Sequence, residues 1–95
     1  MAAYVFAQIE VTDAGLYEEY RKQVLAVVKH YGGKFIVRGG KVDPKEGDWR
    51  PERMIALEFP SMEQAQKWYH SPEYAPLIKL RQKASKGKLI IVEGA

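Results

Sequence analysis

With 95 residues, 46% of them hydrophobic and 28% charged, the chain has the length and composition of one ordinary globular domain. The absence of cysteine excludes disulfide bonds and thiolate metal sites, and no stretch approaches the roughly 20 apolar residues that a membrane span needs. The net charge of +3 is mild, and the basic run from Lys79 to Lys88 has no interleaved aromatic residues, so we expect neither a nucleic acid nor a membrane as partner.

Residues 3–11 alternate between two faces, which predicts a β-strand. One face is apolar and consists of Val5, Ala7, Ile9 and Val11. The other face carries Tyr4 and Phe6 before it becomes polar at Gln8 and Glu10. A face turned to solvent would be polar throughout, so we expect its aromatic half to be covered.

A helix is predicted from the capping residues Thr12 and Asp13 to the pair Gly32 and Gly33, which can adopt the left-handed backbone that ends a helix. Its apolar residues recur in steps of three and four along one stripe, as in a helix that packs on a core. They are Leu16, Tyr20, Val24, Val27, Val28 and Tyr31.

The second strand is predicted from Lys34 to about Val42. Gly39 and Gly40 indicate a bulge or the close approach of another backbone segment. Arg38 places a permanent charge inside this apolar strand. Two interpretations stay open: Arg38 is an edge-strand charge with its head in water, or it holds an anion in a cleft.

A polar turn over residues 43–48 leads to Trp49 and then to a strand predicted over Arg53–Phe59. Trp49 either tethers its loop to the core or packs over the rim of a pocket or against a partner subunit. Glu58 is the second charge that lies within an apolar strand.

Ser61 is the predicted cap of a helix that ends at His70 and Ser71, and Gln64 occupies the reciprocal position of a capping box. A short turn and a further helix from about Ala75 to Ala84 should follow, because a proline near the start prevents one uninterrupted helix.

Gly87 interrupts the pattern, and the last strand is predicted over residues 88–93. This strand is apolar on both faces, so we expect neither face to see much water.

The order strand, helix, strand, strand, helix, strand is that of a split βαβ arrangement. It predicts one α+β domain over residues 1–95 with a ferredoxin-like fold, in which helices cover one face of a four-stranded antiparallel sheet. The other face would expose apolar side chains in a monomer, so we expect two copies to pack sheet to sheet as a homodimer. These side chains are Tyr4, Phe6, Ile36 or Val37, and Ile90 or Val92.

Five segments resemble the bacterial domain-of-unknown-function family 1330, of the dimeric α/β-barrel superfamily. They are Ala3-Tyr-Val-Phe-Ala-Gln-Ile-Glu-Val, Tyr31-Gly-Gly-Lys-Phe-Ile-Val-Arg-Gly-Gly, Glu58-Phe-Pro-Ser, Trp68-Tyr-His-Ser-Pro-Glu-Tyr and Leu89-Ile-Ile-Val-Glu-Gly. The resemblance spans nearly the whole chain and implies a dimeric α/β barrel of bacterial origin, without an assigned activity. The superfamily also includes cofactor-free monooxygenases, haem-degrading enzymes, lactone isomerases and stress-response proteins, whose activities a shared fold does not transfer.

Motifs for cofactors and metals are absent. The glycine pairs do not form a phosphate loop, and no Gly-x-Ser-x-Gly elbow occurs. The two histidines, His30 and His70, lie far apart in the chain and lack the spacing of metal ligands. We therefore expect no cofactor and no metal site.

The remaining aromatic and polar side chains are of the kind that line small-molecule pockets. Arg38 is a candidate to hold a carboxylate or enolate oxygen, and Glu58 or His70 to move a proton, so these three are the candidate catalytic residues. The candidate ligand-binding residues are Gln8, Tyr17, Tyr20, Trp49, Trp68, Tyr74 and Arg81. In the alternative interpretation the aromatic residues are core, and Arg38 pairs with Glu58 across adjacent strands.

Two functions stay open. The first is a cofactor-free enzyme or binder for a small aromatic or carbonyl compound, in a pocket of the dimeric barrel. The second is a non-catalytic dimeric module with a structural or stress-associated role. The N-terminus shows no signal-like segment, which together with the absence of cysteine fits a cytoplasmic location.

Overall fold

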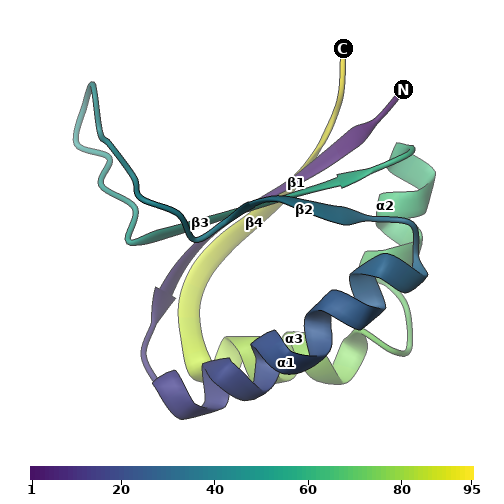
Figure 1. The fold of residues 1–95 in the computed structure, drawn as a ribbon, viewed down its shortest axis with the longest axis horizontal. Coiled ribbons are helices and arrows are strands. Elements are labelled where there is room, and N and C mark those ends of the chain that lie inside the picture. Colours follow the sequence, from purple (N-terminus) through teal and green to yellow (C-terminus); the bar gives the residue numbers. More distant parts are fainter.

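The structure is a computed structural model that describes residues 1–95. The elements in chain order are β1 (Ala3–Val11), α1 (Ala14–His30), β2 (Lys34–Arg38), β3 (Arg53–Phe59), α2 (Met62–Tyr69), α3 (Ala75–Ala84) and β4 (Ser85–Glu93). The four strands form one antiparallel sheet in the order β2-β3-β1-β4, and the three helices lie on one side of it (Figure 1). This arrangement confirms the predicted α+β, ferredoxin-like fold.

The helix ends follow the capping signals of the sequence. The Asp13 side chain accepts a hydrogen bond from the Leu16 backbone N–H (3.1 Å), and Gly32 ends α1 with a φ of 83°. Ser61 caps α2 by accepting from the Gln64 N–H (3.1 Å). The Gln64 side chain does not complete the expected capping box, because its Nε2 donates to the Tyr31 carbonyl (2.8 Å) and so joins α2 to the end of α1.

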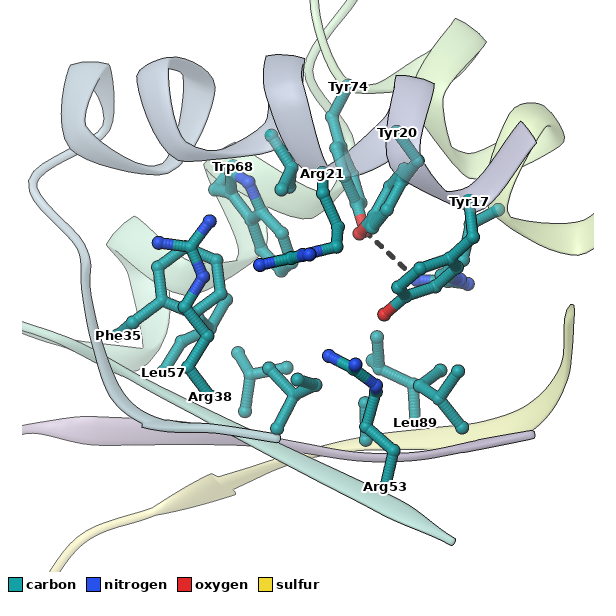
Figure 2. Close-up of a pocket in the computed structure, with 16 residues that line it drawn as sticks. Tyr17, Tyr20, Arg21, Phe35, Arg38, Arg53, Leu57, Trp68, Tyr74 and Leu89 are labelled. Atoms are coloured by element: carbon teal, nitrogen blue, oxygen red, sulfur yellow. Dashed lines mark hydrogen bonds between the residues drawn. The ribbon is translucent and has the colours of Figure 1, made fainter. Parts of the chain in front are cut away.

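Strand β2 differs from its predicted form in a way that matters for the site. It ends at Arg38 rather than near Val42, and its register against β3 shifts between Phe35 and Val37. One extra residue in a strand reverses the alternation of side chains beyond it. Phe35 and Arg38 therefore lie on the same face of the sheet, toward the helices (Figure 2).

Strand β4 begins earlier than predicted. It starts at Ser85, directly after α3, and Gly87 lies within it, opposite Ile9 of β1. A Cβ atom at Gly87 would collide with the Gln8 carbonyl oxygen. This glycine therefore permits β1 and β4 to approach closely and, contrary to the prediction, it does not interrupt the strand.

The core fills the space between the sheet and the helices. Its largest fully buried side chains are Phe59, Trp68 and Tyr74. The sheet face away from the helices stays open in a single chain, and we call it the open face. Its exposed apolar residues are Phe6, Ile36, Val37, Ile90 and Val92. The expectation that β4 sees little water on either face is thus wrong for one chain alone.

Gly87→Ala should lower the free energy of unfolding by about 2 kcal/mol, because the added methyl group forces β4 away from the β1 backbone. Urea denaturation measures this loss. Gly40→Ala is the matched control: nothing lies near a Cβ there, so its effect should stay within about 0.5 kcal/mol. Equal effects at both positions would contradict the close approach.

Candidate functional site

A cavity of about 40 Å³ lies inside the domain, between the sheet and the helices (Figure 2). Sixteen residues line it, of which twelve are hydrophobic or aromatic and the other four are all arginines. The arginines are Arg21, Arg38, Arg53 and Arg81. The lining includes no aspartate, glutamate or histidine, so the only charge that borders the cavity is positive.

A buried hydrogen-bond network borders this cavity. The hydroxyl oxygens of Tyr20 and Tyr74 lie 2.7 Å apart and share a hydrogen bond. Arg81 Nη1 donates to the Tyr74 hydroxyl oxygen at 2.9 Å, and Arg81 is only 9% exposed. Trp68 stacks on Tyr74 with 4.3 Å between ring centroids. This network joins side chains of α1, of the turn before α3 and of α3 itself.

Burial extends to higher pH the range in which the three tyrosines at this cavity stay neutral. It raises the pKa of Tyr20, and the neighbouring Tyr74 raises the pKa of Tyr20 further. Burial also raises the pKa of Tyr74, although the positive charge of Arg81 opposes that shift. The pKa of Tyr17 is raised by burial too, against the opposing charges of Arg53 and Arg21. These hydroxyls can donate and accept hydrogen bonds near neutral pH, but they cannot serve there as anionic bases.

The other three arginines lie on aromatic rings or near the surface. The Arg38 guanidinium lies 4.6 Å from the centroid of the Phe35 ring, and that of Arg53 lies 5.5 Å from the Tyr17 ring. Arg21 pairs with Glu18 at 3.1 Å. Figure 2 shows Arg21, Arg38 and Arg53 pointing into the space between the sheet and α1.

Six of the ten candidate catalytic and ligand-binding residues line this cavity. They are Arg38, Tyr17, Tyr20, Trp68, Tyr74 and Arg81. Sequence reasoning missed Arg21, Arg53 and Phe35. The signals were present: Arg53 shares the strand alternation of Ile55, and Arg21 follows Tyr17 by four residues, one helical turn.

Two candidate catalytic residues, Glu58 and His70, do not line the cavity. Glu58 lies opposite Lys34 in the sheet register and pairs with it at 3.7 Å, so the predicted pair with Arg38 does not form. Arg38 lies opposite Ile55 instead. His70 is exposed at the end of α2, beside the Tyr69 ring.

Gln8 and Trp49 also lie outside this cavity, on the other side of the sheet. Trp49 Nε1 donates to Gln8 Oε1 at 2.7 Å, while the Trp49 ring stays 60% exposed. Together with Phe6, Met54 and Ile90 they border a shallow hollow of about 310 Å³ on the open face. The loop that carries Trp49 projects beyond the sheet (Figure 1). The single pocket that we expected is therefore divided by the sheet into two regions.

Two further observations concern metals and membranes. No group of three or more His, Cys, Asp or Glu side chains lies close enough together to hold a metal ion. None of the helices combines the length and the apolar character that crossing a bilayer requires.

Comparison with known proteins identifies relatives that share the fold. The family described as "Domain of unknown function (DUF1330)" matches residues 2–95. No curated protein matches the chain.

Three solved structures illustrate the similarity. The protein RPA0582 of unknown function from Rhodopseudomonas palustris is 18% identical, with a TM-score of 0.75 over 99% of this chain and 82% of that one. SnoaB, a cofactor-independent oxygenase from Streptomyces nogalater, is 12% identical, with a TM-score of 0.64 over 99% and 92% of the two chains. A dimeric ferredoxin-like protein of unknown function from Jannaschia sp. CCS1 is 10% identical, with a TM-score of 0.71 over 99% and 100%. At these identities the likeness shows a common fold and no common activity.

The raised pKa of Tyr20 predicts a loss of stability in alkaline solution. The unfolded chain releases this proton near the ordinary pKa of 10.0, whereas the folded chain releases it at higher pH. The stabilisation is therefore complete below pH 10.0 and falls as pH rises above that value. Tyr20→Phe should make the decline of the unfolding free energy above pH 10.0 less steep in urea titrations.

Val28→Ala is the control for this experiment, because it removes buried volume without removing an ionisable group. It should lower the unfolding free energy at every pH and keep the wild-type slope. A Tyr20→Phe variant with the wild-type slope would show that Tyr20 ionises alike in both states.

Proposed function

Because the chain belongs to the DUF1330 family, whose description assigns no activity, we propose a function from the pocket itself. The protein binds a small carbonyl or aromatic compound in the arginine- and tyrosine-lined cavity, and acts on it without a resident cofactor. The buried network of Arg81, Tyr74 and Tyr20 carries this proposal.

The network supports a binding role because it is costly for a core this small. A buried charge lowers stability unless a partner compensates it. The Arg81 guanidinium donates a hydrogen bond to the Tyr74 hydroxyl and forms no ion pair with a carboxylate. Apolar walls with a few convergent polar groups are typical of ligand sites. Buried polar or charged groups that lower the stability of the fold and lie beside a cavity are also typical of functional sites.

The chemistry that this cavity favours is stabilisation of negative charge. When a carbonyl compound forms an enolate, its oxygen gains charge that an arginine N–H can stabilise. The cavity holds no carboxylate or histidine to take the proton, so the proton would pass to water or to a basic group of the compound. Glu58 and His70 are not part of this proposal. SnoaB, which shares the fold, is described as acting without a cofactor.

A second candidate function is the non-catalytic dimeric module. The cavity volume of about 40 Å³ favours it, since drug-sized ligands occupy pockets of about 300–1,000 Å³. Under the first proposal the compound is small, or the exposed Arg38 swings outward to admit it. This volume also favours a carbonyl compound over an aromatic one.

Native mass spectrometry of freshly purified protein should detect a retained small molecule. Val24→Phe should abolish this retention, because Val24 lines the cavity and a phenyl ring fills it. Val27→Phe is the matched control on the same helix, at a position that does not line the cavity, and it should keep the molecule. A wild-type protein without any bound mass, also after incubation with small carbonyl compounds, would favour the non-catalytic module.

We further propose that two copies form a homodimer through their open faces. The exposed apolar residues of this face come from β1, β2 and β4, and helices cover only the opposite side. Exposed apolar patches of this kind mark interaction surfaces, and the open face of a second copy offers matching chemistry. The protein from Jannaschia is described as dimeric and has the same fold. We expect roughly 1,500–2,500 Å² of buried surface.

Phe6→Asp should dissociate this dimer at micromolar concentration in light scattering, because Phe6 lies on the open face and a buried carboxylate there would lack a partner. Leu16→Asp is a matched control, since Leu16 is similarly exposed but belongs to α1 on the opposite side. A wild-type monomer would refute the dimer. A dimeric Phe6→Asp protein would exclude the open face as the interface.

A further inference from the structure

We infer that the compound bound in the cavity is a short-chain carboxylate, held by Arg38, Arg53 and Arg81. This inference rests on the proposed small-molecule function and names the chemical class of its ligand. The ligand's carboxylate would supply the negative charge that the cavity lacks.

Three of the four arginines at the cavity lack a carboxylate partner in the protein. None of Arg38, Arg53 and Arg81 forms an ion pair within the chain, whereas the fourth arginine, Arg21, already pairs with Glu18. Three guanidinium groups without counterions border one small volume. Arg81 is buried and Arg53 is half-buried, so water screens the repulsion among these charges only in part, and an anion among them would lower it.

A bulge in β2 and a glycine just after it help to direct two of these arginines, Arg38 and Arg53, into the cavity. The bulge between Phe35 and Val37 turns Arg38 toward the helices. Gly39 follows with a φ of 71°, and a Cβ atom there would lie 2.6 Å from Nη1 of Arg53. A bulge and a bare glycine thus let β2 and β3 direct Arg38 and Arg53 to the same side. Arg81 reaches the cavity from α3.

The lining residues and the size of the cavity favour a carboxylate over a phosphate. A carboxylate is planar and matches the paired N–H groups of a guanidinium, while a phosphate site commonly adds backbone N–H groups or hydroxyls of serine and threonine. No serine, threonine or glycine lines this cavity. Its volume of about 40 Å³ holds roughly three water-sized groups, which limits the ligand to the smallest carboxylates, of two or three carbons.

The indole of Trp68 offers a direct readout, because it lines the cavity and the only other tryptophan, Trp49, lies outside it. In a Trp49→Phe protein, pyruvate should change the Trp68 fluorescence with a saturable dependence on concentration. Pyruvamide, which has the same shape without the charge, should bind at least about tenfold more weakly. Inorganic phosphate should also bind more weakly than pyruvate.

Arg53→Met and Arg81→Met should each weaken pyruvate binding by about tenfold or more, because each removes a charged hydrogen-bond donor. Arg50→Met is the matched control: Arg50 is exposed in the β2–β3 loop, does not line this cavity, and should leave binding unchanged. Should Arg81→Met fail to fold, Arg53→Met and Arg38→Met provide the same test, since Arg53 is only half-buried and Arg38 is exposed.

Three results would overturn the inference. Equal binding of pyruvate and pyruvamide would reject the carboxylate, yet leave the proposed small-molecule site intact. Tighter binding of phosphate than of pyruvate would show that the site prefers a phosphate to a carboxylate. No binding of pyruvate, acetate or malonate would reject a short-chain carboxylate, while the mass-spectrometric search for a retained compound, which does not depend on charge, still decides the proposed function.

Discussion

The hydrogen bond from Arg81 to Tyr74 brings a permanent charge into a core that contains no carboxylate. Tyr74 passes the interaction on to Tyr20 of α1 and stacks on Trp68 of α2, so one polar contact lies where all three helices meet. A guanidinium cannot shed its charge by shifting its pKa, as a buried lysine or glutamate does. The packing around it must therefore accommodate the charge, and the tyrosines do so as neutral hydrogen-bonding partners.

This arrangement is costly for a protein of this size. A 95-residue chain buries a limited share of its surface, and each buried polar group takes space that apolar packing would otherwise fill. Arg38 and Arg53 add further positive charge beside the same volume. At the buried Arg81, leucine or methionine would serve stability better, because hydrophobic replacement of buried charge is often stabilising. The proposed binding function rests on these arginines.

The sheet separates two chemically different regions. Toward the helices it presents the arginine-lined cavity, and on its open face it presents an apolar surface with the contact between Trp49 and Gln8. The bulge in β2 contributes to both, because it turns Arg38 inward and leaves Ile36 and Val37 exposed. In the proposed dimer, the cavity and the interface would lie on opposite faces of the sheet, so that ligand binding would not depend on how the two copies pack.

Local sequence patterns specify most of the helices and strands and their order. Period-two alternation in residues 3–11, the caps at Asp13 and Ser61, and the bounds of β3 and α3 could all be read from local patterns, because they depend on neighbours in the chain. Of the aromatic residues and arginines predicted to line a pocket, all but Trp49 lie around one cavity.

Which charged side chains meet depends on strand register and helix packing, and local sequence patterns do not specify these. Arg38 and Glu58 are both charges in apolar strands, yet the register places Lys34 opposite Glu58 and Ile55 opposite Arg38. One extra residue in β2 reverses the face of every side chain after it, and no local pattern marks the residue at which that happens. Residue spacing places Arg53 on the face of Ile55 and Arg21 on the face of Tyr17. It does not specify that these two faces border one cavity, because strand pairing and helix packing bring those distant segments together.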